Sequence, residues 1–181
     1  MQLKKTKFSG LIFYKRETFK DSRGYFRELF LEKNIKKKFV FDYYSLSNKN
    51  VLRGLHLQLK KTQGKLITLI SGKIFDVVVD CRPKSKTFGQ FFSVELSENK
   101  NTSLYIPEGF AHGYCSLANN TILHYRCTNY RHKASETGIY WNDKSLNINW
   151  PKKKFIISRK DQKNISFEKF LQSKKFNTIQ W

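Results

Sequence analysis

The segment NVLRGLHLQ, residues 50–58, places one arginine and one histidine within an otherwise apolar stretch. As a half-buried strand it would point His56 toward the interior, where an imidazole is an unusual filler. A histidine in such a place packs against its neighbours, binds a metal ion or transfers protons. These three possibilities stay open on this segment alone.

A second polar element is YIPEGFAHGY, residues 105–114, which contains a Pro-x-Gly-x-x-His pattern that ends at His112. This spacing has the form of the second cupin motif, in which proline and glycine set a tight turn and histidine follows on the next strand. A metal-binding cupin also needs an earlier His-x-His pair and a carboxylate, because a catalytic metal takes three or more protein ligands. The matching place reads His-Leu-Gln from His56. We therefore expect no metal site.

Short alternating apolar patterns dominate the chain and predict strands. Turn signals separate them, such as a tight hairpin at Ser71–Lys73, and no long helical pattern lies between them. This organisation predicts an all-β barrel that forms a single domain over residues 1–181. Short peripheral helices are expected over residues 30–39 and 167–176. The strand patterns cover residues 11–19, 24–31, 65–71, 73–81, 91–97, 103–107, 113–118, 121–127 and 138–141.

The segment KIFDVVVD, residues 73–80, places a carboxylate among aliphatic residues whichever face is buried. Ile74, Asp76, Val78 and Asp80 share one face of the predicted strand, and the intervening residues share the other. Polar residues on the inward face of a small barrel are candidates for function. A face toward solvent or at a sheet edge explains Asp76 equally well, and both interpretations stay open.

The charge of the chain points to anions. Its 181 residues include 35 Lys and Arg against 14 Asp and Glu, which gives a formal net charge of +21. A charge of this size attracts anionic partners, and nucleic acid and a phosphate-bearing small substrate are the two candidates. Lysines that only solvate the surface are the third explanation, and charge alone does not separate the three.

The sequence predicts a cytoplasmic protein with reduced thiols. The N-terminal residues lack the long apolar core and small-residue cleavage site of a secretory signal. No run approaches the ~18 consecutive apolar residues of a membrane helix, so no membrane partner is expected. Cys81, Cys115 and Cys127 are unclustered, which favours core thiols over a disulfide framework or a zinc site.

Five segments follow one another along the chain: NVLRGLHLQ, QGKLITLISGKIFDVVVDCRPKSKTFGQF, YIPEGFAHGY, HYRCTNY and NWP. In this combination they resemble the dTDP-4-dehydrorhamnose 3,5-epimerase family, metal-free cupins that act on nucleotide-linked 4-keto sugars. The resemblance covers about residues 21–161. It implies a cupin jelly-roll barrel, usually a homodimer in which the N-terminal part of one subunit helps to close the partner's site.

The family's reaction explains why these residue types are needed. A ketone at C4 acidifies the hydrogens at C3 and C5. Epimerisation then takes a base on one face of the ring, an acid on the other and a cation beside the enolate oxygen. By resemblance, His56 is the base, and Asp161 orients its imidazole and stabilises its charged form. Tyr125 is implied as the acid and Lys65 as the cation by the C4 oxygen, and no cofactor is implied.

The resemblance also assigns residues that bind the substrate. Arg53 is implied as a diphosphate ligand, because its planar fork matches phosphate oxygens. Arg23 and Glu28 match family residues that reach the nucleotide and the sugar, and the ring of Phe26 beside them can stack. The other residues expected to contact the substrate are His112, Arg131, Glu136 and Lys160.

The nucleotide site departs from the family pattern. The segment FDYYS, residues 41–45, usually reads Q-D-N-H-S, so Phe41 and Tyr43 replace two hydrogen-bonding side chains. Arg131 stands where a ring that stacks on thymine is usual. An arginine can donate two hydrogen bonds to O6 and N7 of guanine, so we expect a GDP-linked 4-keto heptose in preference to dTDP-4-keto-6-deoxyglucose. Drift within a thymidine enzyme is the alternative.

Other functions stay open. A C3-only epimerase is the nearest, since one base can serve C3 whereas the second centre depends on the geometry around Tyr125. A 3,4-ketoisomerase on the same barrel is a weaker alternative, and so is a catalytically silent sugar-binding cupin, because all four catalytic residues are present. From another class, a basic barrel rich in aromatic residues could bind single-stranded nucleic acid through an exposed stripe. We expect a nucleotide-sugar partner and no nucleic acid.

Overall fold

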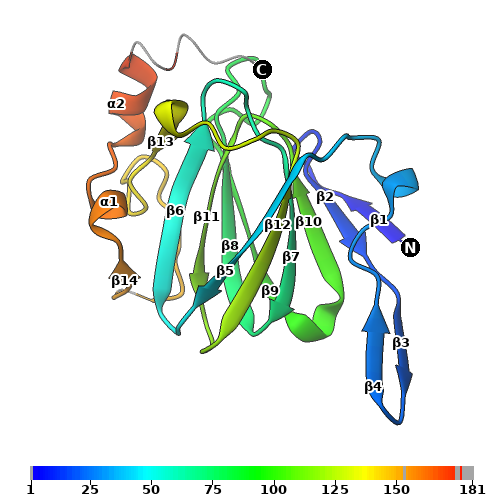
Figure 1. The fold of residues 1–181 in the computed structure, drawn as a ribbon. Coiled ribbons are helices and arrows are strands. Elements are labelled where there is room, and N and C mark those ends of the chain that lie inside the picture. Colours follow the sequence, from blue (N-terminus) through cyan, green and yellow to red (C-terminus); the bar gives the residue numbers. More distant parts are fainter. Residues whose placement is uncertain (1, 153, 174–175, 177–181) are drawn as a thin grey trace.

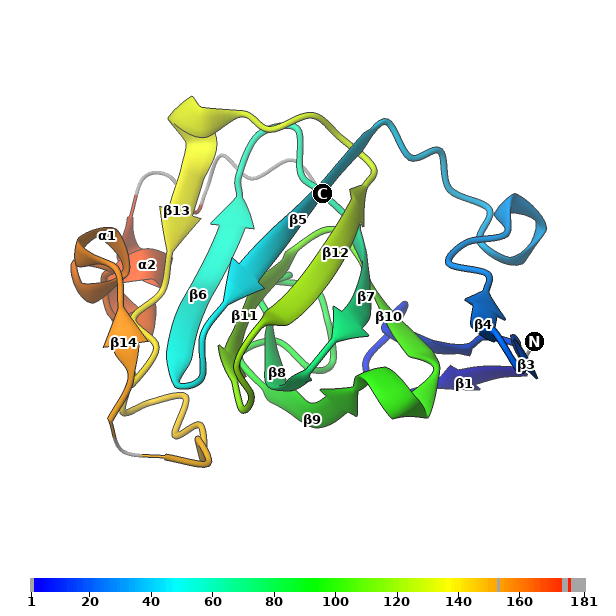
Figure 2. The ribbon, with the colours of Figure 1, turned by 60° about the horizontal axis from the view of Figure 1, so that its bottom comes forward.

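Two β-sheets, antiparallel apart from the short parallel pair of β14 and β6, face each other in the computed structural model, which describes residues 2–152, 154–173 and 176. Figures 1 and 2 show the sheets around a common interior, with the C-terminal helices on one side and an N-terminal hairpin that projects on the other. The predicted all-β jelly-roll barrel with short peripheral helices is confirmed. Among the described residues, no helix has the length and apolar character needed to cross a membrane.

The first sheet has its strands in the order β1-β2-β10-β7-β12-β5. These strands are β1 (Gln2–Lys5), β2 (Ile12–Lys15), β5 (Phe41–Ser47), β7 (Lys65–Ser71), β10 (Thr102–Ile106) and β12 (Thr121–Cys127). Alternate residues point into the barrel, because successive side chains of a strand face opposite sides. Ile67 and Leu69 of β7 and Leu123 and Tyr125 of β12 therefore belong to the buried interior.

The second sheet has the order β13-β6-β11-β8-β9, and β14 pairs with β6 outside this path. Its strands are β6 (Val51–Gln58), β8 (Lys73–Asp80), β9 (Phe91–Ser97), β11 (Phe110–Ser116), β13 (Glu136–Gly138) and β14 (Ile156–Ile157). Strand β8 is buried on both faces: Ile74 and Val78 face the barrel interior, and Val77 and Val79 face outward into another apolar cluster.

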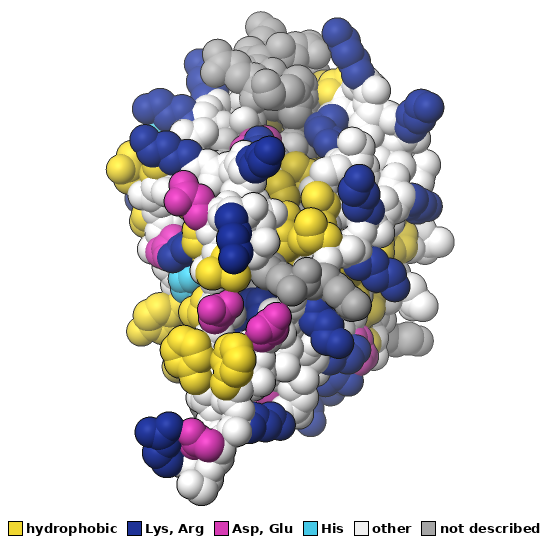
Figure 3. All heavy atoms as spheres, turned by 90° about the vertical axis from the view of Figure 1, so that its right-hand side faces the viewer, with side chains coloured by type: hydrophobic (Ala, Val, Ile, Leu, Met, Phe, Trp, Pro, Cys, Tyr) yellow, Lys and Arg dark blue, Asp and Glu magenta, His cyan; other side chains and the backbone are white. Residues whose placement is uncertain are grey.

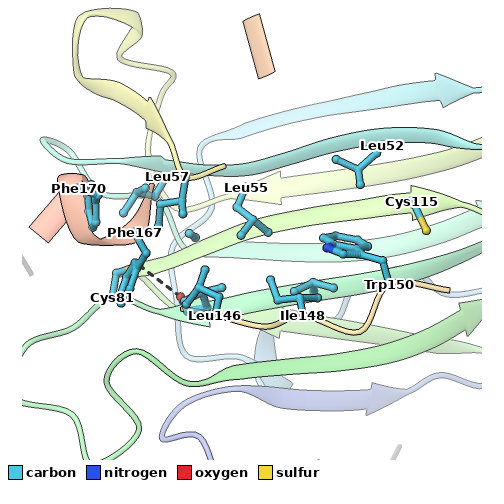
Figure 4. Close-up of a cluster of buried hydrophobic side chains, with 14 of the residues drawn as sticks. Leu52, Leu55, Leu57, Cys81, Cys115, Leu146, Ile148, Trp150, Phe167 and Phe170 are labelled. Atoms are coloured by element: carbon cyan, nitrogen blue, oxygen red, sulfur yellow. Dashed lines mark hydrogen bonds between the residues drawn. The ribbon is translucent and has the colours of Figure 1, made fainter. Parts of the chain in front are cut away.

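The C-terminal part of the chain covers the outer face of the second sheet, as Figure 4 shows. Helix α1 (Arg159–Gln162) precedes helix α2 (Phe167–Gln172), from which Phe167 and Phe170 enter the apolar cluster beside Leu57. Trp150 lies further along the same cluster. Burying a phenylalanine side chain contributes about 1.5–3 kcal/mol. The C-terminal segment is therefore held on the sheet by its aromatic side chains.

A separate hairpin of β3 (Thr18–Asp21) and β4 (Gly24–Arg27) projects from the barrel (Figure 1). The strand predicted over residues 11–19 is thus divided between β2 and β3, and the one predicted over 24–31 ends at Arg27. Arg16 lies at the break, where its buried side chain donates a hydrogen bond to the Glu28 carbonyl at 3.5 Å. The chain leaves the first sheet at Arg16, and the residues after it form the projecting hairpin.

Other local predictions need correction. The helix predicted over residues 30–39 is only a 3₁₀ helix of three residues, Glu32–Asn34, because Ile35 is extended and packs under the first sheet. The turn at Ser71–Lys73 is tight, with Gly72 at φ +88°, but it links the two sheets and forms no hairpin. The strand predicted over residues 138–141 lies earlier, because β13 ends at Gly138 and only an isolated bridge at Ile139 follows. The helix predicted over residues 167–176 is confirmed for 167–172, and residues 174–175 lie outside the described residues.

Candidate active site

A cavity of about 480 Å³ opens between the two sheets, lined by residues of β5, β6, β7, β11 and β12 together with β13 and α1. Its walls mix aromatic, basic and acidic side chains. The structure brings nine of the predicted site residues to this cavity: Arg53, His56, Lys65, His112, Tyr125, Arg131, Glu136, Lys160 and Asp161.

Strand β6 turns two of these side chains inward because it carries one extra residue. His56 lies opposite His112 of β11. Arg53, three residues before His56, lies opposite Tyr114, which is only two residues after His112. This β-bulge lets Arg53 and His56 both line the cavity, although residues three apart on a regular strand face opposite sides. Gly54 lies in the bulge at φ +135°, and a Cβ there would lie 2.5 Å from Gly113 Cα. The close approach of the two strands therefore requires glycine.

His56 and Asp161 form a hydrogen-bonded pair at the cavity wall. Nε2 of His56 lies 2.6 Å from Oδ1 of Asp161, and the imidazole is 39% exposed against 5% for the carboxylate. Asp161 lies in the first turn of α1, where the hydroxyl of Ser158 accepts a hydrogen bond from its amide. Burial would raise the pKa of Asp161, but the hydrogen bond and charge of His56 and the Gly54 amide hold that pKa below its usual value. An ionised carboxylate thus orients an accessible imidazole.

Tyr125 reaches the cavity from the opposite sheet. Its ring stacks on that of Tyr43, with centroids 4.5 Å apart and planes at 9°, and meets the His112 ring edge-on at 6.1 Å. Burial raises the pKa of Tyr125 well above its ordinary value, and the neighbouring phenols of Tyr114 and Tyr43 act in the same direction. The phenol therefore keeps its proton at neutral pH and is available as a donor.

Lys65 lies at the start of β7 and is only 9% exposed. Burial lowers the pKa of Lys65, while the nearby groups of Cys127 and Glu136 act in the opposite direction. An ammonium in such a place is poorly solvated, so it gains from any negative charge that develops next to it. The position suits a cation beside an enolate oxygen.

A second histidine–carboxylate pair is fully buried in the barrel. Nε2 of His112 lies 2.7 Å from Oδ2 of Asp76, with the two side chains 5% and 1% exposed. Oδ1 of Asp76 has no hydrogen-bond partner within the described part of the chain. Asp76 is therefore an inward residue, and the alternative of a solvent-facing position is wrong because both faces of β8 are covered. Its contact orients His112, which lines the cavity.

An acidic side chain links two cations on the cavity wall. Glu136 accepts two hydrogen bonds from Arg131, at 2.6 Å from Nε and 3.1 Å from Nη2, and one from Lys160 at 3.2 Å. The hydrogen bond from Arg131 is the main cause that lowers the pKa of Glu136, to about 2, against the opposing effect of burial. Glu136 is therefore ionised at all ordinary pH values.

The cavity carries an excess of positive charge. Arg53 is held by hydrogen bonds from Nε to the Ser47 hydroxyl at 3.1 Å and from Nη2 to the Leu46 carbonyl at 3.2 Å. Four basic side chains line the cavity against two carboxylates, so it attracts an anion of about two charges. The six residues are Arg53, Lys65, Arg131 and Lys160 against Glu136 and Asp161. Within residues 2–152, 154–173 and 176, no three His, Cys, Asp or Glu side chains form a group that could hold a metal ion.

Three predicted site residues lie elsewhere in this chain. Arg23, in the β3–β4 hairpin, is 88% exposed and pairs with Asp21 at 2.6 Å. Phe26 is 66% exposed, and Glu28 lines a different cavity beside Arg16. Figure 3 shows apolar side chains above the charged tip of the hairpin, at the bottom of the view. Within one chain, Arg23, Phe26 and Glu28 therefore do not line the cavity that holds the other predicted site residues.

Sequence reasoning missed the residues that support the site. The Tyr114 hydroxyl lies 3.0 Å from that of Ser45 and 2.9 Å from that of Ser47. Nothing in the sequence marks these partners, because they are 69 and 67 residues apart from Tyr114. A signal for Ser158 does exist, since Ser-x-x-Asp in SRKD is the spacing of a helix N-cap and an acidic third residue.

Comparison with known proteins agrees with this geometry. The family described as dTDP-4-dehydrorhamnose 3,5-epimerase matches residues 5–169. The epimerase of that name from Methanothermobacter thermautotrophicus is 43% identical over 166 residues, 87% of this chain and 90% of the relative. The one from Shigella flexneri is 42% identical over 183 residues, 97% of this chain and 99% of the relative.

Solved structures give the same result. The Legionella pneumophila dTDP-6-deoxy-D-glucose-3,5-epimerase, in complex with dTDP-4-keto-L-rhamnose, has a TM-score of 0.88 and 38% identity, covering 92% of this chain and 93% of that one. The Mycobacterium tuberculosis epimerase has a TM-score of 0.92 and 31% identity, covering 100% and 94%. With the match over nearly the whole chain, this protein is a sugar epimerase and belongs to the dTDP-4-dehydrorhamnose 3,5-epimerase family.

Proposed function

We propose that the protein inverts C3 and C5 of a dTDP-linked 4-keto-6-deoxy sugar such as dTDP-4-keto-6-deoxyglucose. The observation that carries the proposal is that the His56–Asp161 pair, from β6 and α1, and the phenol of Tyr125, from β12 of the other sheet, line one cavity. The relative from Legionella pneumophila, crystallised with dTDP-4-keto-L-rhamnose, supports the same substrate class.

The reaction proceeds by proton transfer through an enolate. The neutral imidazole of His56 removes the proton from C3 or C5, the C–H electron pair moves into the enolate, and Asp161 stabilises the imidazolium. Lys65 stabilises the negative charge that develops on the C4 oxygen. At C5, Tyr125 then protonates the carbon from the opposite face, whereas at C3 a water molecule on that face does so. Solvent takes the proton from His56 and restores the one on Tyr125. General acid–base groups of this kind contribute about 10²–10⁴-fold each.

The cations of the cavity bind the diphosphate in this proposal. Arg53 is the main ligand, because its guanidinium offers a planar pair of donors to phosphate oxygens. Lys160 lies on the same wall, next to Asp161 in the sequence and 3.2 Å from Glu136. The excess of two positive charges among the lining residues matches a diphosphate dianion.

Thymidine is a better candidate for the nucleotide than guanosine. The preference for a GDP-linked heptose depended on a free Arg131, but the Nε and Nη2 edge of Arg131 already donates to both oxygens of Glu136. A guanine would have to compete with a charge-assisted, two-donor contact. The names of the relatives from Methanothermobacter thermautotrophicus and Shigella flexneri specify dTDP, and nothing supports GDP or a heptose.

We further propose that the protein works as a homodimer whose second copy completes the cavity. The β3–β4 hairpin exposes Phe19, Tyr25 and Phe26, each more than half accessible, and a cluster of exposed aromatic side chains marks an interaction site. Arg23, Phe26 and Glu28 would then contact the substrate in the partner's cavity. This arrangement accounts for their place outside the cavity of their own chain.

Deuterium exchange tests the reaction and the nucleotide together. The protein is incubated in D₂O with 4-keto sugars linked to dTDP and to GDP, and label at C3 and C5 is followed by NMR. We expect label at both carbons of the dTDP substrate and at least tenfold less with GDP. Label at C3 alone would establish a C3-only epimerase, and exchange confined to the GDP substrate would overturn the thymidine assignment.

A further inference from the structure

Tyr43 of β5 holds the ring of the proposed acid. It lies directly opposite Tyr125 in the antiparallel pair of β5 and β12, and the two rings stack with centroids 4.5 Å apart and planes at 9°. Directly opposite residues are the closest side-chain neighbours across two antiparallel strands. A face-to-face contact of this kind fixes the plane of the Tyr125 ring and the direction in which its hydroxyl points.

Tyr43 also contacts a second aromatic ring. The ring of Phe41 lies 5.4 Å from that of Tyr43 at 33°, and Tyr130 lies 6.5 Å from Phe41. The rings of Tyr125, Tyr43 and Phe41 thus follow one another along one wall of the cavity, and the exposed ring of Tyr130 continues the row outside it. Tilting Tyr125 away from its present plane would therefore require Tyr43 and Phe41 to move with it.

We propose that Tyr43 is a positioning residue that acts through Tyr125 and sets the efficiency of C5 inversion relative to C3. The inference rests on the proposed function, in which Tyr125 delivers the proton that completes inversion at C5. A displacement of about 1 Å in a reacting group can cost about 10²-fold in rate. The stacked ring keeps the phenol within that tolerance, and the hydroxyl of Tyr43 takes no part.

Substitutions at position 43 separate the ring from the hydroxyl. Tyr43→Phe retains the stack, whereas Tyr43→Leu and Tyr43→Met keep an apolar side chain without a planar face. We expect Tyr43→Phe to stay within about twofold of wild type, and the other two to lower the C5-to-C3 exchange ratio at least tenfold with KM changed less than threefold. Tyr44→Leu is the matched control, because Tyr44 is the next residue on the strand, faces away from the cavity and is 70% exposed.

A double-mutant cycle tests whether Tyr43 acts through Tyr125. Tyr125→Phe removes the acid, so adding Tyr43→Leu to it should cause no further loss at C5, whereas independent effects would multiply. Equal losses at C3 and C5, a raised KM with an unchanged ratio, or multiplying effects would each overturn the proposal. Wild-type protein that exchanges neither carbon would instead refute the proposed function, which keeps the two failures distinct.

Discussion

The hydrogen bond between His56 and Asp161 decides what the site can do at the scale of single residues. The carboxylate is buried and ionised, and the imidazole is the part of the pair that a substrate can reach. A free histidine would rotate and would lose the partner that stabilises its charged form. The pair therefore supplies both the orientation and the charge balance that a catalytic base needs.

Removal of the imidazole should abolish the reaction. We expect His56→Ala to lower deuterium exchange at both C3 and C5 by at least about 10²-fold, because no other base lies on that face of the sugar in the proposed mechanism. His132→Ala is the matched control, since its side chain bonds to Ser135 and does not line the cavity. Exchange at C3 that survives in His56→Ala would show that another residue is the base.

The contact between Glu136 and Arg131 should appear in the pH dependence of stability. The pKa of Glu136 is about 2 in the folded protein against an ordinary value of 4.5. Its contribution is therefore complete above about pH 5 and is lost as the pH falls toward 2. We expect Glu136→Gln to destabilise the protein at pH 7 and to do so by a smaller amount at pH 3, as measured by urea unfolding. If wild type and Glu136→Gln differ in their free energy of unfolding by the same amount at pH 7 and pH 3, the pKa of Glu136 is not lowered in the folded protein.

The residues proposed for catalysis could be grouped from the sequence because they lie in motifs of fixed spacing. His56, Lys65, Tyr125 and Asp161 line one cavity, as the resemblance implied, although their roles stay predictions. The state of Arg131 could not be predicted, because its partner Glu136 is fixed by the course of a loop and not by a motif. Because the sequence does not show this contact, the expectation of a GDP-linked substrate treated the Arg131 guanidinium as free to bind guanine.

At the scale of elements, the bulge in β6 is the feature that the sequence did not reveal. An alternating pattern predicts that residues three apart face opposite sides, so Arg53 and His56 would not be placed together. The extra residue changes this, and its effect depends on the strand opposite, where Gly113 leaves room for Gly54. The hairpin predicted at Ser71–Lys73 was wrong for a similar reason. The sequence marks the turn at Gly72 but does not show that the strand after it belongs to the other sheet.

Substitution of the glycine in the bulge should damage both stability and activity. Gly54→Ala adds a methyl group that would lie 2.5 Å from Gly113 Cα, at a backbone φ of +135°. Strain of this kind costs about 1–3 kcal/mol before the clash is counted. Gly24→Ala is the control, because Gly24 has φ +131° with nothing within 4 Å of the added Cβ. If Gly54→Ala and Gly24→Ala lower the free energy of unfolding by the same amount, the close approach of β6 and β11 adds no cost of its own.

At the scale of the whole molecule, a shared cavity can be tested by mixing subunits. In a mixed dimer of His56→Ala with the double variant Arg23→Ala and Phe26→Ala, one cavity would combine an intact His56 with an intact hairpin. We expect activity to appear when the two impaired proteins are unfolded and refolded together. Each protein refolded alone is the control, and mixtures no more active than these would refute the composite site.

The net charge of +21 should affect binding more than chemistry. Screening between exposed charges acts over about 8 Å at physiological salt. We expect KM for the nucleotide sugar to rise several-fold between 50 mM and 500 mM salt while kcat changes less than twofold. A KM that does not respond to salt would mean that the surplus charge only solvates the surface. Tight, length-dependent binding of oligonucleotides would favour the nucleic-acid alternative instead.

The proposed catalytic pair of His56 and Asp161 joins two parts of the chain that are synthesised at different times. Asp161 comes 105 residues after His56 and reaches it through α1, which follows the pairing of β14 with β6 and is anchored by α2. A ribosome could release every strand of the two facing sheets before this carboxylate emerged. In the proposed mechanism, a chain that stops before residue 161 would therefore carry His56 without the carboxylate that orients it.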